Sequence, residues 1–378
     1  MPAQPVPSPY WGAGIQADTV LAVSVASWIP ASAGMTFLGH LAKLSYMEIN
    51  TLREDDMPDK PVDFTELLKG APKNWGRWGA NDEIGALNFL TNAEVLRGVR
   101  AVQQGKTFML GVPVARPKGD PLHPIRAQPI HTLTHDEGFY ISGRSQPFAG
   151  GLKYTDDVIV MYPQGTTQYD ALGHAWYGDK LYNGFDPKTT IGGLQKCSIE
   201  PIANHGVIGR GILIDAARYK GKKHLDRGEG VTLDDVLGAA KKQGVTIEKH
   251  DILVLHTGWL NRFYEEGQNA FFPDGEFDEP GLQYSKELVE WFHEMEIPSI
   301  TADNVGCEQG CDRNLGGTLG ALHAALLCNL GVIFNEIVWL KDLADDCDKD
   351  KQYTFLFAGA PLKLVYGCGS AVNPIAIK

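Results

Sequence analysis

Residues 251–259, which read DILVLHTGW, constrain the fold of this chain more than any other segment. Their apolar run is short and almost continuous, which is typical of a strand buried within a sheet. Strands of this kind occur where helices cover the sheet. The segment therefore predicts an α/β fold.

Predicted helices and strands alternate around this segment. Residues 232–244 form a predicted helix, because they begin with a Thr–Asp capping box and end at a glycine. Residues 285–296 have the apolar spacing of an amphipathic helix, and residues 297–304 read as a strand that leads into a loop. Short β-rich runs and Gly, Pro and Asp turns fill residues 105–215. We predict a single α/β domain with a mixed β-sheet and helices packed outside it.

The first 46 residues differ from the rest of the chain. They contain Asp18 as their one acidic residue, show no periodicity and are rich in Pro, Ala, Gly and Ser. We expect residues 1–46 to be a non-native or disordered extension, with Met47 or Met57 as the biological start. Residues 47–378 are then the folded domain.

The balance of charges and cysteines limits the partners and the compartment. A net charge of −12 and the lack of a Lys/Arg-rich run argue against nucleic acid and membrane surfaces as partners. The apolar residues 20–38 are interrupted by Ser, Pro and Gly, so they suit neither a signal peptide nor a membrane span. Six cysteines are too few for a disulfide scaffold and indicate free thiols in a reducing compartment. We expect a cytoplasmic protein that acts on a small molecule.

Residues 162–184, YPQGTTQYDALGHAWYGDKLYNG, concentrate side chains that bind metals or move protons. Gln168 and Asp170 would share one face of a strand, whereas Asp170 and His174 would share one face of a helical turn. A strand that becomes a helix at Asp170 would therefore bring these side chains together with Gln164. Asp and His near a turn are as often capping and surface residues, so the residues alone leave both readings open.

This segment resembles the signature of the cyclase family, which includes kynurenine formamidase and carries the motif His-x-Gly-Thr-His-x-Asp-x-Pro-x-His. Asp170 matches the family's metal-binding Asp, and His174 matches its terminal catalytic His. Gln164 and Gln168 stand where the motif has two histidines, and Leu172 stands where it has proline. These replacements resemble a large branch of the family with Gln-x-Gly-Thr-Gln-x-Asp-Ala-Leu-x-His.

The resemblance extends from about residue 74 to residue 377, through ordered blocks such as NWGRWGANDEIGALN and GVIGRGILIDAA. It implies the swivelling β/β/α fold of the cyclases. It also implies two further metal ligands, His323 and Glu336. Without it, His323 would be a satisfied helix histidine and Glu336 a solvated charge at a strand edge. Glu336 stands in the apolar run VIFNEIVWL, where a carboxylate needs a cation or a partner.

The implied activity is metal-dependent hydrolysis of an amide, lactam or ester bond. One divalent ion, Mn²⁺ or Zn²⁺, would activate a water molecule. Its expected ligands are Asp170, His323, Glu336, Gln164 and Gln168. His174 would act as general base and acid.

The expected substrate is a small aromatic or cyclic carbonyl compound in an apolar pocket. The side chains expected to line this pocket are Trp176, Tyr177, Tyr182, Phe139 and His131, the last in a stretch that reads as a loop. The two Gln replacements leave a second reading, a metal-poor small-molecule binder or lyase on the same fold. We expect a homodimer or homotetramer.

Overall fold

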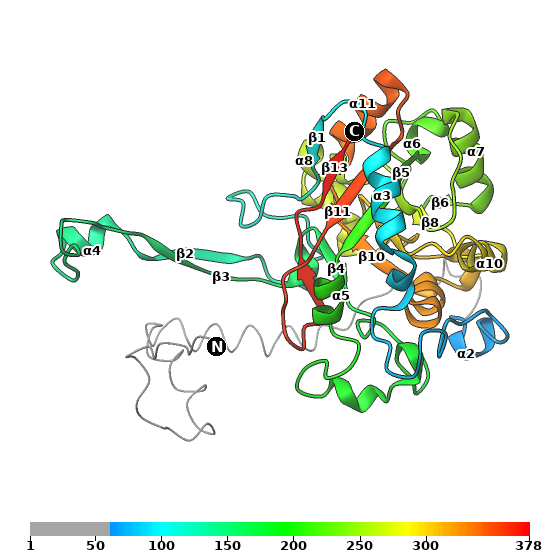
Figure 1. The fold of residues 1–378 in the computed structure, drawn as a ribbon, viewed down its shortest axis with the longest axis horizontal. Helices are drawn as coiled ribbons and strands as arrows, with labels where there is room; N and C mark the ends of the chain where they lie inside the picture. Colours follow the sequence, from blue (N-terminus) through cyan, green and yellow to red (C-terminus); the bar gives the residue numbers. More distant parts are fainter. Residues whose placement is uncertain (1–60) are drawn as a thin grey trace, which may run out of the picture. The chain divides into compact units, whose positions relative to one another are not determined.

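A computed structural model describes residues 61–378, which belong to one compact unit (Figure 1). The predicted extension, residues 1–46, lies outside the described residues. Nine strands form one mixed sheet in the order β1–β13–β11–β5–β7–β9–β10–β4–β12. The predicted α/β fold with a mixed sheet is confirmed.

The centre of the sheet is parallel and its two sides are antiparallel. The parallel strands are β5 (Val207–Asp215), β7 (Ile252–His256), β9 (Ser299–Ala302) and β10 (Ile333–Glu336). Beyond β5 lie β11 (Thr354–Gly359), β13 (Ile375–Ile377) and β1 (Thr107–Met109). Beyond β10 lie β4 (Gln168–Asp170) and β12 (Gly369–Ala371). Every residue of β7 is buried, as its apolar run predicts.

Helices and short turns connect the strands and pack around the sheet (Figure 1). The α-helices are α2 (Phe64–Leu67), α3 (Asn92–Arg100), α4 (Glu137–Ile141), α5 (Ile199–His205), α6 (Ala216–Tyr219), α7 (Leu233–Gln243), α8 (Trp259–Glu266), α9 (Gln268–Phe271), α10 (Lys286–Glu294) and α11 (Lys341–Asp350). A π-helix, η8, spans His323–Leu330. The 3₁₀ turns are η2 (Gly85–Phe89), η3 (Pro163–Gly165), η4 (Tyr182–Gly184), η5 (Pro187–Thr190), η6 (Pro273–Gly275) and η7 (Arg313–Leu315). A small parallel sheet pairs β6 (Gly230–Val231) with β8 (Gly281–Leu282).

The predicted start and end of helix α7 are confirmed. Helix α7 begins at the capping box of Thr232 and Asp235, and Gly244 ends it in the left-handed conformation. Helix α3 packs on β5 so closely that a Cβ on Gly98 would lie 2.6 Å from the carbonyl oxygen of Gly209. Glycines at both positions therefore permit this contact. Within the described residues, no helix is long and apolar enough to cross a membrane.

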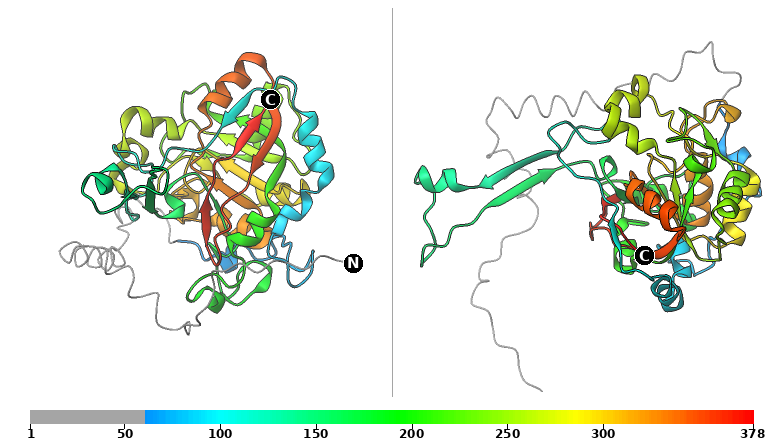
Figure 2. Two further views of the ribbon diagram at one scale, coloured as in Figure 1. Left: turned by 60° about the vertical axis from the view of Figure 1, so that its left-hand side comes forward. Right: turned by 90° about the horizontal axis from the view of Figure 1, so that it is seen from above.

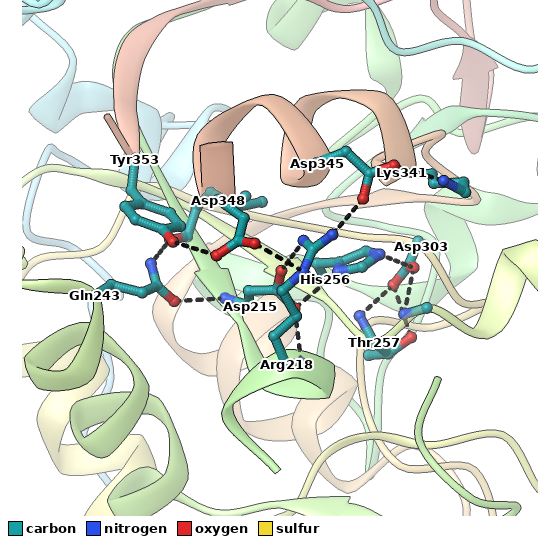
Figure 3. A network of polar contacts seen from close by, with 12 residues as sticks. Asp215, Arg218, Gln243, His256, Thr257, Asp303, Lys341, Asp345, Asp348 and Tyr353 are labelled. Carbon is teal, nitrogen blue, oxygen red and sulfur yellow. Dashed lines mark hydrogen bonds and ion pairs between the residues drawn. The ribbon is translucent and has the colours of Figure 1, made fainter. Parts of the chain in front are cut away.

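A buried polar network joins the carboxyl ends of three parallel strands (Figure 3). His256 ends β7, and its Nδ1 lies 2.9 Å from Asp215, which ends β5. Its Nε2 lies 3.8 Å from Asp303, just beyond β9. Asp303 also accepts hydrogen bonds from the backbone of Thr257 and Gly258, each at 2.7 Å. Burial alone would lower the pKa of His256, but the charges of Asp215 and Asp303 raise it. The opposite charges of the network therefore stabilise one another and link the carboxyl ends of these strands.

A hairpin arm, residues 130–160, forms a two-stranded sheet that no third strand joins among the described residues. Strand β2 (Ile130–His135) pairs with β3 (Asp156–Val160), and Figures 1 and 2 show the arm leaving the main sheet. The loop predicted around His131 is therefore wrong, because its β-branched residues pair with those of β3. Val158, Ile159 and Val160 are 44%, 46% and 53% exposed, so apolar side chains lie on both faces of β3.

We expect the arm to be covered by another copy of the chain, since an isolated two-stranded hairpin is only marginally stable in water. The predicted homodimer or homotetramer would supply that cover. Light scattering after size exclusion should give a dimer or tetramer for the wild type and a shift toward monomer for Ile159→Lys. The charge-changing control Asp156→Lys should leave the mass unchanged. A monomeric wild-type protein would contradict this expectation.

Candidate active site

The residues predicted to bind metal converge where β4 and β10 lie side by side. Glu336 ends β10 and pairs across the ladder with Gln168 of β4. Residues two apart in a strand point to the same face, so Asp170 lies on that face as well. His323 reaches it from the first turn of η8. A π-helix is rare and is frequently found at functional sites.

Three of these side chains have the geometry of a metal site. One donor atom from each of Asp170, His323 and Glu336 lies within 4.8 Å of the other two. The Nε2 atom of His323 is 3.6 Å from Asp170 Oδ2 and 3.6 Å from Glu336 Oε1. Nitrogen and oxygen ligands about 2.1 Å from one ion lie roughly 3 to 3.5 Å from each other. The three side chains therefore fit one divalent ion with little adjustment.

The buried carboxylates of Asp170 and Glu336 require positive charge nearby. Asp170 is fully buried, and neither carboxylate oxygen has a hydrogen-bond partner among the described residues. Burial opposes its ionisation, but the charges of His174 and His323 lower the pKa of Asp170. Burial and the neighbouring charge of Asp170 raise the pKa of Glu336. Two carboxylates this close remain ionised together only with positive charge between them.

Glu308 holds His323 in the orientation that a metal ligand needs. Its carboxylate accepts hydrogen bonds from the backbone N–H groups of Leu322 (2.8 Å) and His323 (3.0 Å) and from His323 Nδ1. With Nδ1 bound to Glu308, the Nε2 atom of His323 is the one turned toward Asp170 and Glu336. A second carboxylate that fixes the tautomer in this way is the usual partner of a metal-binding histidine.

The two glutamines of the motif lie on different sides of this site. The Gln168 amide nitrogen donates to Glu336 Oε2 at 2.6 Å, while its buried Oε1 has no partner among the described residues. The Gln164 amide nitrogen donates to the sulfur of Cys368 at 3.3 Å. Gln168 is thus beside the three candidate ligands, whereas Gln164 faces the neighbouring thiol.

His174 lies beside the candidate ligands, at the edge of the site. Its Nε2 is 3.9 Å from Asp170 Oδ1, and its ring centre is 6.3 Å from that of His323. The helix predicted after Asp170 is absent, because the chain makes a tight turn in which His174 N–H donates to Ala171. Burial would lower the pKa of His174, but Asp170 and a hydrogen bond with Cys368 raise it. The ring is therefore well placed to hold a proton near the candidate ligands.

A cavity of about 340 Å³ opens beside these residues. Its polar lining includes His174, His323 and Glu336. Its apolar walls include Trp176 and Phe277. The space suits a small molecule with a ring-sized apolar part.

Comparison with known proteins decides the family. The structure of a protein described as a novel cyclase is 36% identical to this chain, with a TM-score of 0.72 over 81% of this chain and 100% of that one. The model of the family Cyclase matches residues 109–309, more than half of the 378 residues. The chain belongs to the cyclase family.

Structures of lower sequence identity are also similar to this chain. An isatin hydrolase bound to the product analogue thioisatinate is 16% identical, with a TM-score of 0.50 over 77% of this chain and 97% of that one. Isatin hydrolase A from Ralstonia solanacearum is also 16% identical, with a TM-score of 0.48 over 72% of this chain and 91% of that one. Comparison with curated proteins gives no match.

The residues predicted to bind substrate in this cyclase are dispersed. Trp176 lines the cavity. Tyr177 donates its hydroxyl to Asn329, and the buried Tyr182 donates its hydroxyl to Asp82, so both support the fold beside the site. His131 lies on the arm, 2.7 Å from Asp157, and Phe139 lies in α4 near its tip; neither lines the cavity.

Four residues of this cyclase site carry no local motif in the sequence. Glu308, Glu279 and Arg126 line the cavity, and Cys368 contacts Gln164. Glu308 stands in the turn-rich stretch GCEQG soon after a predicted strand, which is the one signal that could have located it. The other three reach the site only through tertiary packing.

We expect the single replacements Asp170→Ala, His323→Ala and Glu336→Ala each to remove most bound Mn²⁺ or Zn²⁺ from the cyclase. Pairs of replacements should lose little more than single ones, because the first loss already empties a shared site. Elemental analysis of protein purified without chelator measures this. The control Asp179→Ala removes an exposed carboxylate of the same segment and should keep its metal. Full metal occupancy in Glu336→Ala would contradict the shared site.

Proposed function

We propose that this protein is a metal-dependent hydrolase that opens an amide, lactam or ester bond of a small aromatic or cyclic carbonyl compound. The observation that carries the proposal is the convergence of Asp170, His323 and Glu336 within 4.8 Å, beside a cavity that His323, Glu336 and His174 line. Membership of the cyclase family agrees with it. The proposed class of reaction includes that of kynurenine formamidase, which the resemblance of the sequence implies.

The ion and the side chains have separate tasks in the proposed reaction. A divalent ion in this site would lower the pKa of a water molecule and polarise the scissile carbonyl. Glu308 keeps the His323 ring oriented for binding, and the Gln168 amide keeps the Glu336 carboxylate in place. His174 takes a proton at Nε2 and returns it to the leaving nitrogen or oxygen.

The donor set leads us to propose Mn²⁺ or Zn²⁺. Two carboxylates and one imidazole suit both ions, whereas no thiolate belongs to the cluster. We propose one ion for this set of three. All six cysteines are free, which agrees with the reducing cytoplasm as the proposed location.

We expect His174→Ala to lower kcat by about 10²- to 10⁴-fold, because the proton transfer loses its carrier. Metal content and melting temperature should stay near those of the wild type. Turnover is measured on the lactam, formamide or lactone that a screen of the Mn²⁺-loaded protein identifies. The control His205→Ala alters an exposed histidine at the end of α5 and should leave turnover unchanged.

Two results would contradict this assignment. Near-full activity of His174→Ala would remove His174 from the reaction. Loss of bound metal in the same variant would make it a ligand. Separately, a wild-type protein that binds no metal would favour the alternative function, a small-molecule binder or a lyase, over the proposed hydrolase.

A further inference from the structure

Glu279 is the one carboxylate of the cavity whose two oxygens both lack a partner among the described residues. It is 1% exposed, yet it lines the cavity beside Glu308 and Glu336. Glu308 accepts three hydrogen bonds, and Glu336 accepts one from Gln168. A buried carboxylate without such partners is destabilising unless a cation or a proton neutralises it. This group is therefore a candidate for contact with a bound molecule.

Hydrogen bonds and a close backbone contact hold the segment around Glu279 in place. The Glu279 carbonyl oxygen accepts from Gly310 N–H at 2.9 Å. The Asn304 side chain donates to the Pro280 carbonyl oxygen at 2.7 Å. At Gly281, a Cβ would lie 2.2 Å from the carbonyl oxygen of Glu308, so the two segments touch backbone to backbone. These contacts fix the backbone that carries Glu279, but none of them is a hydrogen bond to its carboxylate.

Gln309 adds a second unsatisfied acceptor to the same wall. Its amide nitrogen donates to the Gly228 carbonyl oxygen at 2.7 Å, which leaves Oε1 free. Gln309 is 8% exposed and lines the cavity, and its neighbour Gly310 binds the backbone of Glu279. The cavity's guanidinium, that of Arg126, donates instead to the Gln164 carbonyl oxygen at 2.9 Å. Glu279 and Gln309 therefore present unpaired acceptor oxygens on this part of the wall.

Unpaired acceptor oxygens select ligands by their polar hydrogens. A ligand N–H group donates to such oxygens, whereas a carbonyl or carboxylate oxygen would repel them. A cationic nitrogen fits best, because a buried carboxylate is stabilised most by an opposite charge. Burial and the charge of Glu336 raise the pKa of Glu279, so its carboxylate needs a neighbouring positive charge to remain ionised.

We propose that Glu279 and Gln309 form a subsite for a hydrogen-bond-donating nitrogen of the substrate, with an ammonium group as its best fit. The subsite rests on the proposed function, since it lies in the wall of the same cavity as His174 and Glu336. The substrate then carries two features, a scissile carbonyl group and a nitrogen that donates hydrogen bonds. Phe277 and Trp176 contact the apolar part between them.

Isothermal titration of the Mn²⁺-loaded full chain tests this subsite without turnover. The probes are benzylamine, which is an ammonium ion at neutral pH, and the uncharged benzyl alcohol. The wild type should bind benzylamine at least about tenfold more tightly, the usual advantage of a charge-assisted hydrogen bond. Glu279→Gln should lose this preference and keep its affinity for benzyl alcohol. The control Glu290→Gln alters an exposed carboxylate of α10 and should keep the preference.

The melting temperature and metal content of Glu279→Gln complete the test. Because the carboxylate has no protein partner, the variant should melt at or above the wild-type temperature with its metal retained. Equal affinities of the wild type for both probes, or a preference that survives in Glu279→Gln, would overturn the subsite. Failure of Glu279→Gln to fold would assign Glu279 a structural role, and loss of an ion would make it a metal ligand; either result overturns the subsite. If the preference holds but no lactam, formamide or lactone is hydrolysed, the subsite stands and the proposed hydrolysis fails.

Discussion

The structure places two carboxylates, Asp170 and Glu336, side by side in the interior of a sheet, and the surrounding arrangement depends on how their charge is balanced. Neighbouring like charges away from water oppose each other's ionisation strongly. The pKa values move apart accordingly, that of Asp170 downward and that of Glu336 upward. His323 lies 3.6 Å from both, and Glu308 fixes its ring from behind. A divalent ion bound between them would resolve the conflict with the side chains where they stand.

The carboxyl ends of the neighbouring strands hold a polar cluster with a structural role. Asp215, His256 and Asp303 end neighbouring strands and neutralise one another, with backbone N–H groups completing Asp303 (Figure 3). In Asp170 and Glu279, by contrast, both carboxylate oxygens are buried without a described partner, whereas the network leaves one ring nitrogen, His256 Nε2, without one. Since native proteins pair nearly all buried polar groups, unpaired oxygens in a cavity wall mark the places where a ligand completes the structure. On this basis we assign the Asp215–His256–Asp303 cluster a structural role, and Asp170 and Glu279 a role in ligand binding.

Much of this could be predicted from the sequence because the signals are local. The apolar run of β7 and the capping box of α7 depend on neighbouring residues, and both elements form as predicted. His323 and Glu336 were identified through family resemblance, which encodes tertiary proximity that spacing does not. In sequence, an aromatic residue next to a motif looks the same whether it faces a cavity or, like Tyr182, is buried and donates to Asp82. Glu279 and Cys368 could not be predicted, because each comes to the site through packing of segments remote in sequence.

Anomalous diffraction from crystals of the full chain grown with Mn²⁺ tests the central claim most directly. We expect one strong peak at the manganese edge within about 2.5 Å of donor atoms of Asp170, His323 and Glu336, the range of Mn²⁺-like ions with oxygen and nitrogen ligands. His323 should bind through Nε2 while Nδ1 stays on Glu308. A map without a peak between these side chains, or with the ion held elsewhere, would contradict the account.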